Sequence, residues 1–171
     1  IVTTAAERVV VVSANGAMRK GFPIDLKNPG APPAPLGTPV ACDVDGDGRL
    51  EIVLAAADKR LHAITANGVS ASGFPKTLDG VVRGAPTCVS GRRQTLVFAT
   101  DAGNLVRLSG SKMEALAKIG AGSESGVAVA DVDGDGQLEF VVGGGDAQVH
   151  LIDELGKEEA GFPYRMTFRS A

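Results

Sequence analysis

The stretch of sequence that decides the fold is Asp-Val-Asp-Gly-Asp-Gly-Arg-Leu-Glu-Ile, at residues 43–52. It recurs 88 positions later as Asp-Val-Asp-Gly-Asp-Gly-Gln-Leu-Glu-Phe, at residues 131–140. Each copy places four carboxylates within nine residues and leads into an apolar run that is typical of a β-strand. The recurrence indicates a repeat architecture, and the crowded like charges indicate a cation site.

A weaker repeat lies midway between the two acidic stretches, at half of their 88-residue spacing. This middle copy keeps the apolar runs, since residues 95–99 resemble residues 51–55 and residues 105–108 resemble residues 61–64. It has Ser-Gly-Arg-Arg-Gln at residues 90–94, where the other copies have their acidic loop. The chain therefore contains units of similar strands, and the middle unit has lost the charges.

Each unit is expected to contain four short strands, separated by turns that are rich in Gly, Asp and Asn. In the second unit we expect these strands at residues 39–42, 50–56, 61–65 and 73–78. Four strands in roughly 40–50 residues are typical of a propeller blade, whereas a helical solenoid needs a 3.6-residue periodicity that is absent here. We therefore predict an all-β fold, a segment of a β-propeller built of four-stranded antiparallel blades.

We expect a single propeller segment over residues 1–171, with about 3.75 blades in the chain. The first blade is expected to lack its innermost strand, because residues 1–2 align with residues 52–53 in the second strand of the next unit. The expected blades are residues 1–30 (incomplete), 37–80, 84–120 and 126–168. Either a larger chain or self-association with another copy would complete the ring, because an exposed blade edge invites pairing.

The repeat register also decides two local assignments. Residues 111–119 are the one stretch that could pass for a helix, and the register places them in the outer strand of a blade. Cys42 and Cys88 occupy corresponding strands of different units. We therefore predict that the two cysteines do not pair and that each is a small buried hydrophobic side chain.

Each acidic loop has the composition of a cation site. Asp at positions one, three and five places three carboxylates on the concave side of a tight curl, for which the intervening glycines supply unusual backbone angles. Position seven offers a backbone carbonyl, and Glu at position nine completes the set. Hard oxygen ligands in this number suit Ca²⁺, which takes about 6–8 oxygens.

Two alternatives to a calcium loop are an EF-hand and an Asp-Gly turn without metal. An EF-hand needs a bidentate Glu at position twelve, where this chain has Leu54 and Val142, so that alternative is excluded. In a turn without metal, like charges about 4 Å apart repel by about 1 kcal/mol per pair even in water. Four carboxylates this close together therefore favour the site with a cation.

The nine-residue pattern Asp-x-Asp-x-Asp-Gly-x-x-Glu, set between strands of the repeat, resembles the FG-GAP repeats of integrin alpha-subunit propellers and their bacterial VCBS-type relatives. Position nine is usually Asp in that family and is Glu here. The resemblance implies two Ca²⁺ sites, bound through positions one, three, five, seven (by its backbone carbonyl) and nine. The implied ligands are Asp43, Asp45, Asp47, Arg49 and Glu51 in the first site, and Asp131, Asp133, Asp135, Gln137 and Glu139 in the second.

The two histidines are the natural candidates for a general base, and the repeat argues against that role. His62 and His150 occupy the same repeat position, where the other units have Val10 and Val106. A residue that recurs in register is better interpreted as a feature of the strand. We therefore predict no catalytic residues in this chain and no cofactor other than calcium.

Composition limits the binding modes of the chain. Its formal charge of −3 gives no basic face for nucleic acid, and it has no apolar run long enough to span a membrane. It has no tryptophan and a single tyrosine, Tyr164, which disfavours a carbohydrate site built on stacking. The aromatic residues of the recurring Gly-Phe-Pro triplets are expected to anchor the packing of blades: Phe22, Phe74 and Phe162.

The resemblance implies a non-catalytic calcium-binding module for protein recognition, adhesion or scaffolding, in which Ca²⁺ stabilises the loops between strands. The expected partner is another protein or an extracellular polymer, and the expected setting is extracellular, cell-surface or periplasmic, where calcium is plentiful. The alternative is a non-catalytic part of an extracellular hydrolase or lyase, with the active site on a domain or blades outside this chain.

Overall fold

The computed structural model describes residues 1–4, 6–27, 35–90 and 94–167. Over these residues the chain forms four antiparallel sheets and no helix, which confirms the predicted all-β class. The first sheet has three strands: β1 (Val2–Thr3), β2 (Arg8–Val10) and β3 (Ile24–Asp25). The second has four: β4 (Val40–Cys42), β5 (Glu51–Ala56), β6 (Arg60–Ile64) and β7 (Lys76–Thr77).

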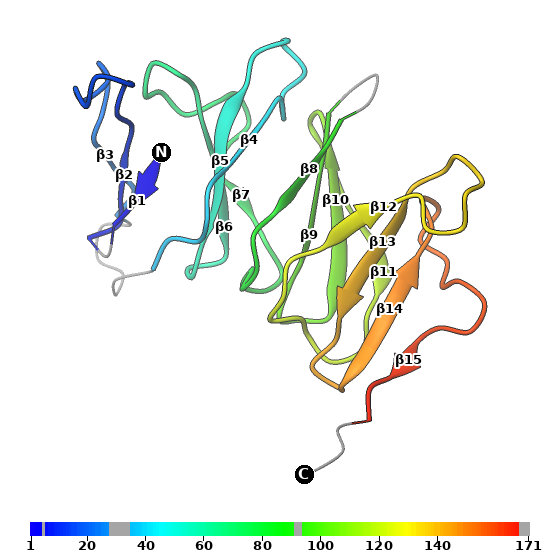
Figure 1. Ribbon diagram of the computed structural model, residues 1–171. Helices are drawn as coiled ribbons and strands as arrows, with labels where there is room; N and C mark the ends of the chain where they lie inside the picture. The colour runs from blue at the N-terminus through cyan, green and yellow to red at the C-terminus, as the bar shows by residue number, and fades with distance from the viewer. Residues whose placement is uncertain (5, 28–34, 91–93, 168–171) are drawn as a thin grey trace.

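The third and fourth sheets repeat the arrangement of the second. The third sheet contains β8 (Thr87–Val89), β9 (Thr95–Ala99), β10 (Asn104–Ser109) and β11 (Lys112–Lys118). The fourth contains β12 (Ala128–Ala130), β13 (Glu139–Gly143), β14 (Gln148–Ile152) and β15 (Tyr164–Arg165). In every sheet, strands that follow one another in the chain are paired, and the sheets stand in a row in chain order (Figure 1).

β5, the second strand of the second sheet, is buried on both of its faces. All six of its residues are buried. Successive side chains of a strand point to opposite faces. Ile52 and Leu54 pack in a core shared with the first sheet, while Val53 and Ala55 pack in a core shared with the third. This explains why the sequence of β5 is a continuous apolar run after its glutamate.

The hydrophobic core is divided into three clusters, each between two neighbouring sheets. Between the third and fourth sheets, Val97 and Ala99 of β9 pack with Phe140 and Val142 of β13. The stability of such an array is approximately a sum of contributions from each unit and each interface. The acidic loops therefore sit on a scaffold in which every four-stranded sheet packs against its neighbours.

The recurring turns also pack sheet against sheet. Gly21 and Gly68 both have positive φ, at 91° and 83°. A Cβ atom on Gly21 would lie 2.1 Å from the carbonyl oxygen of Asn67, and one on Gly68 would lie 2.3 Å from that of Gly21. The Gly-Phe-Pro turn of the first sheet thus touches the Asn-Gly turn of the second so closely that neither position has room for a side chain.

The aromatic residue of the Gly-Phe-Pro triplets has the predicted packing role in two of three cases. Phe22 lies in the core between the first and second sheets, and Phe74 packs against the core between the second and third. Phe162 is half-buried. The peptide bond that follows each of these phenylalanines is cis.

The assignment of residues 111–119 to an outer strand is confirmed, because β11 occupies Lys112–Lys118 and pairs with β10. The prediction for the cysteines is wrong. Cys42 and Cys88 form a disulfide, with their Cα atoms 5.7 Å apart. Their strands, β4 and β8, are the equivalent edge strands of adjacent sheets and lie in contact. Equivalent positions in the repeat therefore become neighbours in space at this edge.

Candidate metal centres

Each acidic loop joins the first and second strands of a four-stranded sheet. The first loop begins after β4 ends at Cys42 and closes at Glu51, the first residue of β5. The second begins after β12 ends at Ala130 and closes at Glu139, the first residue of β13. Because those strands are paired, the loop is tied at both of its ends to a formed sheet.

The first aspartate of each loop organises the curl. Asp43 accepts hydrogen bonds from the amides of Gly46, at 2.8 Å to Oδ1, and of Gly48, at 3.0 Å to Oδ2. Asp131 accepts the corresponding bonds from the glycine amides three and five residues later, at 2.7 and 3.1 Å. All four glycines have φ between 81° and 87°, as the sequence predicts for a tight curl.

The ninth residue of each loop is buried and turns back to the second. Glu51 and Glu139 are 2% and 3% exposed. Glu51 Oε2 accepts a hydrogen bond from the amide of Val44 at 3.2 Å, and Glu139 Oε2 accepts one from Val132 at 2.7 Å. Both loops therefore have the same arrangement, in which the carboxylate of the ninth residue is buried beneath an exposed curl.

The electrostatic cost of this arrangement is visible at Glu51. Burial raises the pKa of its carboxyl above the usual value, and the negative charges of Asp45, Asp47 and Asp43 raise it further. The hydrogen bond from the Val44 amide acts in the opposite direction. A divalent cation would relieve both the burial and the repulsion of this charge.

Three carboxylates of each loop converge. Ligand oxygens of Asp43, Asp45 and Glu51 all lie within 4.8 Å of one another, and the equivalent oxygens of the second loop do the same. That second group is Asp131, Asp133 and Glu139. Positions one, three and nine of the expected ligand set are thus brought together in both loops, with the spacing and the hard oxygen chemistry that suit Ca²⁺.

Position five lies outside that group. Asp47 Oδ1 accepts a hydrogen bond from the amide of Arg49 at 2.8 Å. Asp135 Oδ1 accepts one from the amide of Gln137, also at 2.8 Å, and its Oδ2 accepts another from the Gln137 side chain. Here the fifth residue stabilises the turn toward position seven. Its role as a ligand, and that of the carbonyls at position seven, stays a prediction.

Sequence reasoning missed two contacts between the first loop and the third sheet. The amide of Asp43 donates a hydrogen bond to Gln94 Oε1 at 2.6 Å, although the two residues are 51 positions apart. The disulfide of Cys42 with Cys88 lies immediately before the loop. A cysteine next to the first acidic residue was the visible signal for the second contact, whereas nothing in the sequence marks Gln94.

Both histidines are buried in the third strand of a four-stranded sheet. His62 is in β6 and His150 in β14, and the Nε2 atom of each is buried with no hydrogen-bond partner among the described residues. Burial lowers the pKa of His62. Nδ1 of His150 lies 3.1 Å from a carboxylate oxygen of Glu158. Their burial at equivalent positions agrees with the interpretation of these residues as features of the strands.

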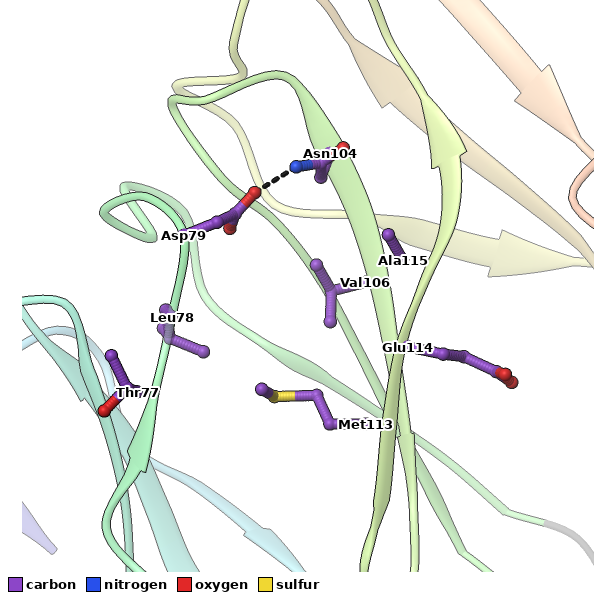
Figure 2. Close-up of a pocket in the computed structure, with 8 residues that line it drawn as sticks. All are labelled: Thr77, Leu78, Asp79, Asn104, Val106, Met113, Glu114 and Ala115. Carbon is purple, nitrogen blue, oxygen red and sulfur yellow. Dashed lines mark hydrogen bonds between the residues drawn. The ribbon is translucent and has the colours of Figure 1, made fainter.

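A separate hollow of about 370 Å³ lies between the second and third sheets (Figure 2). Leu78, Val106 and Met113 give it an apolar wall, while the side chain of Glu114 points away from it. Within it, the side-chain amide of Asn104 donates a hydrogen bond to the carboxylate of Asp79. This polar contact joins the connection after β7 to the start of β10.

No protein-family model matches the chain, and no curated protein matches its sequence. Its structure is similar to the crystal structure of BBS1N in complex with ARL6DN, soaked with lead, with a TM-score of 0.61 and 14% identity over 92% of this chain. The same complex soaked with mercury gives a TM-score of 0.60 and 16% identity over 93% of this chain. The crystal structure of BamB from Moraxella catarrhalis gives a TM-score of 0.43 and 16% identity, covering 95% of this chain and 62% of BamB.

The chain spans about half the length of BBS1N, 49% in both structures. Among the residues that the structure describes, no helix has the length and apolar character needed to cross a membrane.

The count of about 3.75 blades and the blade boundaries stay predictions. BBS1N is a β-propeller, and identity this low shows the fold alone. Together with the row of four antiparallel sheets, this similarity shows that the chain has a β-propeller fold.

Proposed function

We propose that the chain is a non-catalytic, calcium-binding propeller module of the FG-GAP and VCBS type, whose surface recognises another protein or an extracellular polymer. The observation that carries the proposal is the convergence of three carboxylates in each of two loops of the same geometry. In this proposal Ca²⁺ is held by the acidic loops and ties the end of a sheet's first strand to the start of its second.

The donor chemistry of the loops supports calcium over other metals. The converging groups are all carboxylates, and Ca²⁺ prefers such hard oxygen ligands. The buried Glu51 carboxyl, whose pKa is raised by burial and by neighbouring aspartates, gains most from a cation. The positive φ angles of the loop glycines give the tight curl that a small cation site needs.

A recognition or scaffolding role, without catalysis, is supported by the positions of the histidines. His62 and His150 are 8% and 4% exposed and lie inside the sheets. A general base must reach the proton that it removes, within about 2.6–3.2 Å or through one water. The equivalent places of these two residues in the repeat suit a structural role better than a catalytic one.

The disulfide supports an extracellular, cell-surface or periplasmic setting. Disulfides persist in oxidising compartments and are rare in the cytosol of mesophiles. The Cys42–Cys88 bond connects adjacent sheets of the propeller. Extracellular calcium would also keep the acidic loops loaded, so the two features favour the same setting.

A protein partner is the favoured ligand class because BBS1N, which has a similar fold, is in complex with ARL6DN in its crystal structure. For the present chain we propose recognition through the propeller surface. Self-association that extends the row of sheets is part of the same proposal, because over the described residues the first sheet has three strands where the others have four.

The calcium proposal is tested by thermal unfolding of the chain in excess calcium and in excess chelator. Binding at a hundredfold excess over Kd stabilises by about 2.7 kcal/mol per site. For a chain of this size that raises Tm by roughly 5–10 °C per site. The triple variant Asp43→Asn, Asp45→Asn, Glu51→Gln should lose about half of the gain.

The matched control is Glu154→Gln, which removes one exposed charge outside the loops and should keep the full calcium response. An unchanged melting curve in chelator would contradict the calcium proposal. Turnover assays against extracellular polymers address the non-catalytic part separately, and hydrolysis or lyase activity of this chain would contradict that part.

A further inference from the structure

We propose that the first acidic loop is anchored across the seam between the second and third sheets, so that reducing the Cys42–Cys88 disulfide weakens calcium binding there and not at the second loop. The inference rests on the proposed calcium function and names a regulation of one of its two sites. Two contacts to the third sheet support it: the disulfide itself, and a hydrogen bond to Gln94, whose side-chain oxygen also lies 3.5 Å from Cys88 Sγ.

The first contact is covalent. Cys42 is the last residue of β4, it directly precedes Asp43, and its disulfide partner lies in β8 of the neighbouring sheet. Cys42 is fully buried in the core between these two sheets. The residue directly before the loop is therefore held by the third sheet as well as by its own.

The second contact is a hydrogen bond. Gln94, directly before β9 of the third sheet, accepts from the amide of Asp43 at 2.6 Å. Asp43 is also the residue whose carboxylate accepts from the amides of Gly46 and Gly48 and forms the curl. The main chain of this aspartate is thus fixed from the third sheet, while its side chain shapes the loop.

The second loop supplies an internal control. Its curl, its buried glutamate and its group of three carboxylates repeat those of the first loop. The residue before Asp131 is Ala130, which cannot form a disulfide. The loops differ in one more respect, because Val44 is buried in the core between the second and third sheets whereas Val132 is 52% exposed. A change that acts through the disulfide should nevertheless separate two sites that share their curl, their buried glutamate and their converging carboxylates.

The physical reason is pre-organisation. A ligand whose main chain is already fixed loses little conformational freedom when the cation binds, and removing groups that orient a ligand typically costs 10–100-fold in metal affinity. A dithiol reductant gives two electrons and two protons to the Cys42–Cys88 bond, forming two thiols, and is itself oxidised to a cyclic disulfide. Asp43 then keeps its hydrogen bond to Gln94 of the third sheet but loses the covalent link next to it.

Linkage makes the effect reciprocal, so calcium should in turn protect the disulfide. If reduction lowers the affinity of the first site tenfold, saturating calcium should make the disulfide harder to reduce by about 30 mV. This shift is measured by equilibrating the protein with dithiol buffers of known ratio, with and without calcium. It is a readout that does not depend on any biological activity.

The experiment uses the full chain with one site disabled at a time. Asp131→Asn with Asp133→Asn leaves the first site, and Asp43→Asn with Asp45→Asn leaves the second. Calorimetric titration with calcium, in oxidised and dithiol-reduced protein, should show the Kd of the first site rising about tenfold or more on reduction. The Kd of the second should stay within about twofold.

A second variant keeps the test valid if reduction unfolds the chain. Gln94→Leu, measured in the oxidised protein with only the first site active, should raise Kd by about tenfold. An unchanged Kd in this variant overturns the inference, as does equal weakening of both sites on reduction. Absence of calcium binding to the oxidised wild-type chain would instead overturn the proposed function, so the two failures are distinguishable.

Discussion

The carboxylate of Glu51 accepts a hydrogen bond from the amide of Val44. The last residue of the first acidic loop is thus joined to the second residue of the same loop. Glu139 and Val132 make the same contact in the other loop. In both cases the glutamate is nearly inaccessible to solvent. The loop is therefore closed by a buried charge, which is tolerable with a cation and costly without one.

Glu51→Gln should stabilise the metal-free protein at neutral pH and reduce its gain from calcium. Because the native pKa of Glu51 is raised, the native state holds this proton more tightly than the unfolded state. Stability is therefore lost as pH rises from about 4.5 through the native pKa. Urea unfolding in chelator measures the free energy of unfolding at pH 4.5 and at pH 7. Its decline from pH 4.5 to pH 7 should be smaller in the variant than in the wild-type chain.

The control is Glu154→Gln, which changes an exposed glutamate and should leave the decline in the free energy of unfolding unchanged. The expectation fails if Glu51→Gln lowers stability in chelator at pH 7. It also fails if the variant keeps the full calcium response, because a carboxylate of the proposed site would then be dispensable.

Asp47→Asn should weaken calcium binding less than Asp45→Asn does. Asp45 belongs to the converging carboxylates, whereas Asp47 accepts a hydrogen bond from the amide of Arg49. An asparagine side chain retains an oxygen that accepts this bond, so the turn should persist. Calorimetric titration of both variants, with the second site disabled, measures the difference. Equal losses of affinity would indicate that Asp47 moves to the cation.

His62→Val should remove part of the pH dependence of stability. Burial lowers the pKa of His62 in the native state, against which the charge of Asp58 acts. As pH falls below about 6.5, the unfolded chain therefore takes up the proton before the native chain does. The contribution of His62 to stability is present above that pH and is lost as pH falls to the native pKa. Valine fits the strand, since Val106 holds the equivalent place in β10.

Urea unfolding at pH 5.5 and 7.5, in chelator, tests this expectation. Both proteins keep the opposite contribution of Glu51, so the test is their difference: on acidification the free energy of unfolding of the wild-type chain should fall relative to that of the variant. The variant should also be the more stable at pH 5.5 because it carries no buried Nε2 without a partner. Parallel pH profiles for the two proteins would contradict the assignment of this effect to His62.

The strands were predictable from sequence because each unit repeats the same apolar runs between the same turn residues. β5 and β13 follow the acidic loops directly, and β11 was placed by register alone against a helical alternative. The positive φ of the loop glycines followed from the need for a tight curl. These features depend on local sequence, and the same local pattern occurs several times in an internal repeat.

Contacts between sheets were harder to predict. Because Cys42 and Cys88 occupy corresponding strands of different units, we predicted that they do not pair, but equivalent edge strands of adjacent sheets lie side by side. The hydrogen bond from Asp43 to Gln94 joins residues 51 positions apart, with no pattern to mark it. The position of Asp47 depends on which backbone amide its side chain meets, and composition does not determine that.

Asn104 and Asp79 should show energetic coupling across the seam between the second and third sheets. The Asn104 side chain donates to the Asp79 carboxylate and is 8% exposed. Hydrogen bonds to charged groups contribute about 1.5–3 kcal/mol, and the exposure of Asp79 favours the lower end. Asn104→Ala also removes a buried Oδ1 that has no partner among the described residues, so the single variant is ambiguous.

A double-mutant cycle of Asn104→Ala and Asp79→Ala isolates the interaction, because effects that each change has separately cancel. Urea unfolding should give a coupling energy of about 1.5 kcal/mol. The control cycle uses Thr77→Ala in place of Asp79→Ala, because Thr77 lies in the outer strand β7 and lines the same hollow. Thr77→Ala should couple only weakly with Asn104→Ala. A coupling energy near zero for the first pair would mean that this hydrogen bond does not stabilise the seam, which the disulfide and the apolar core would then hold together.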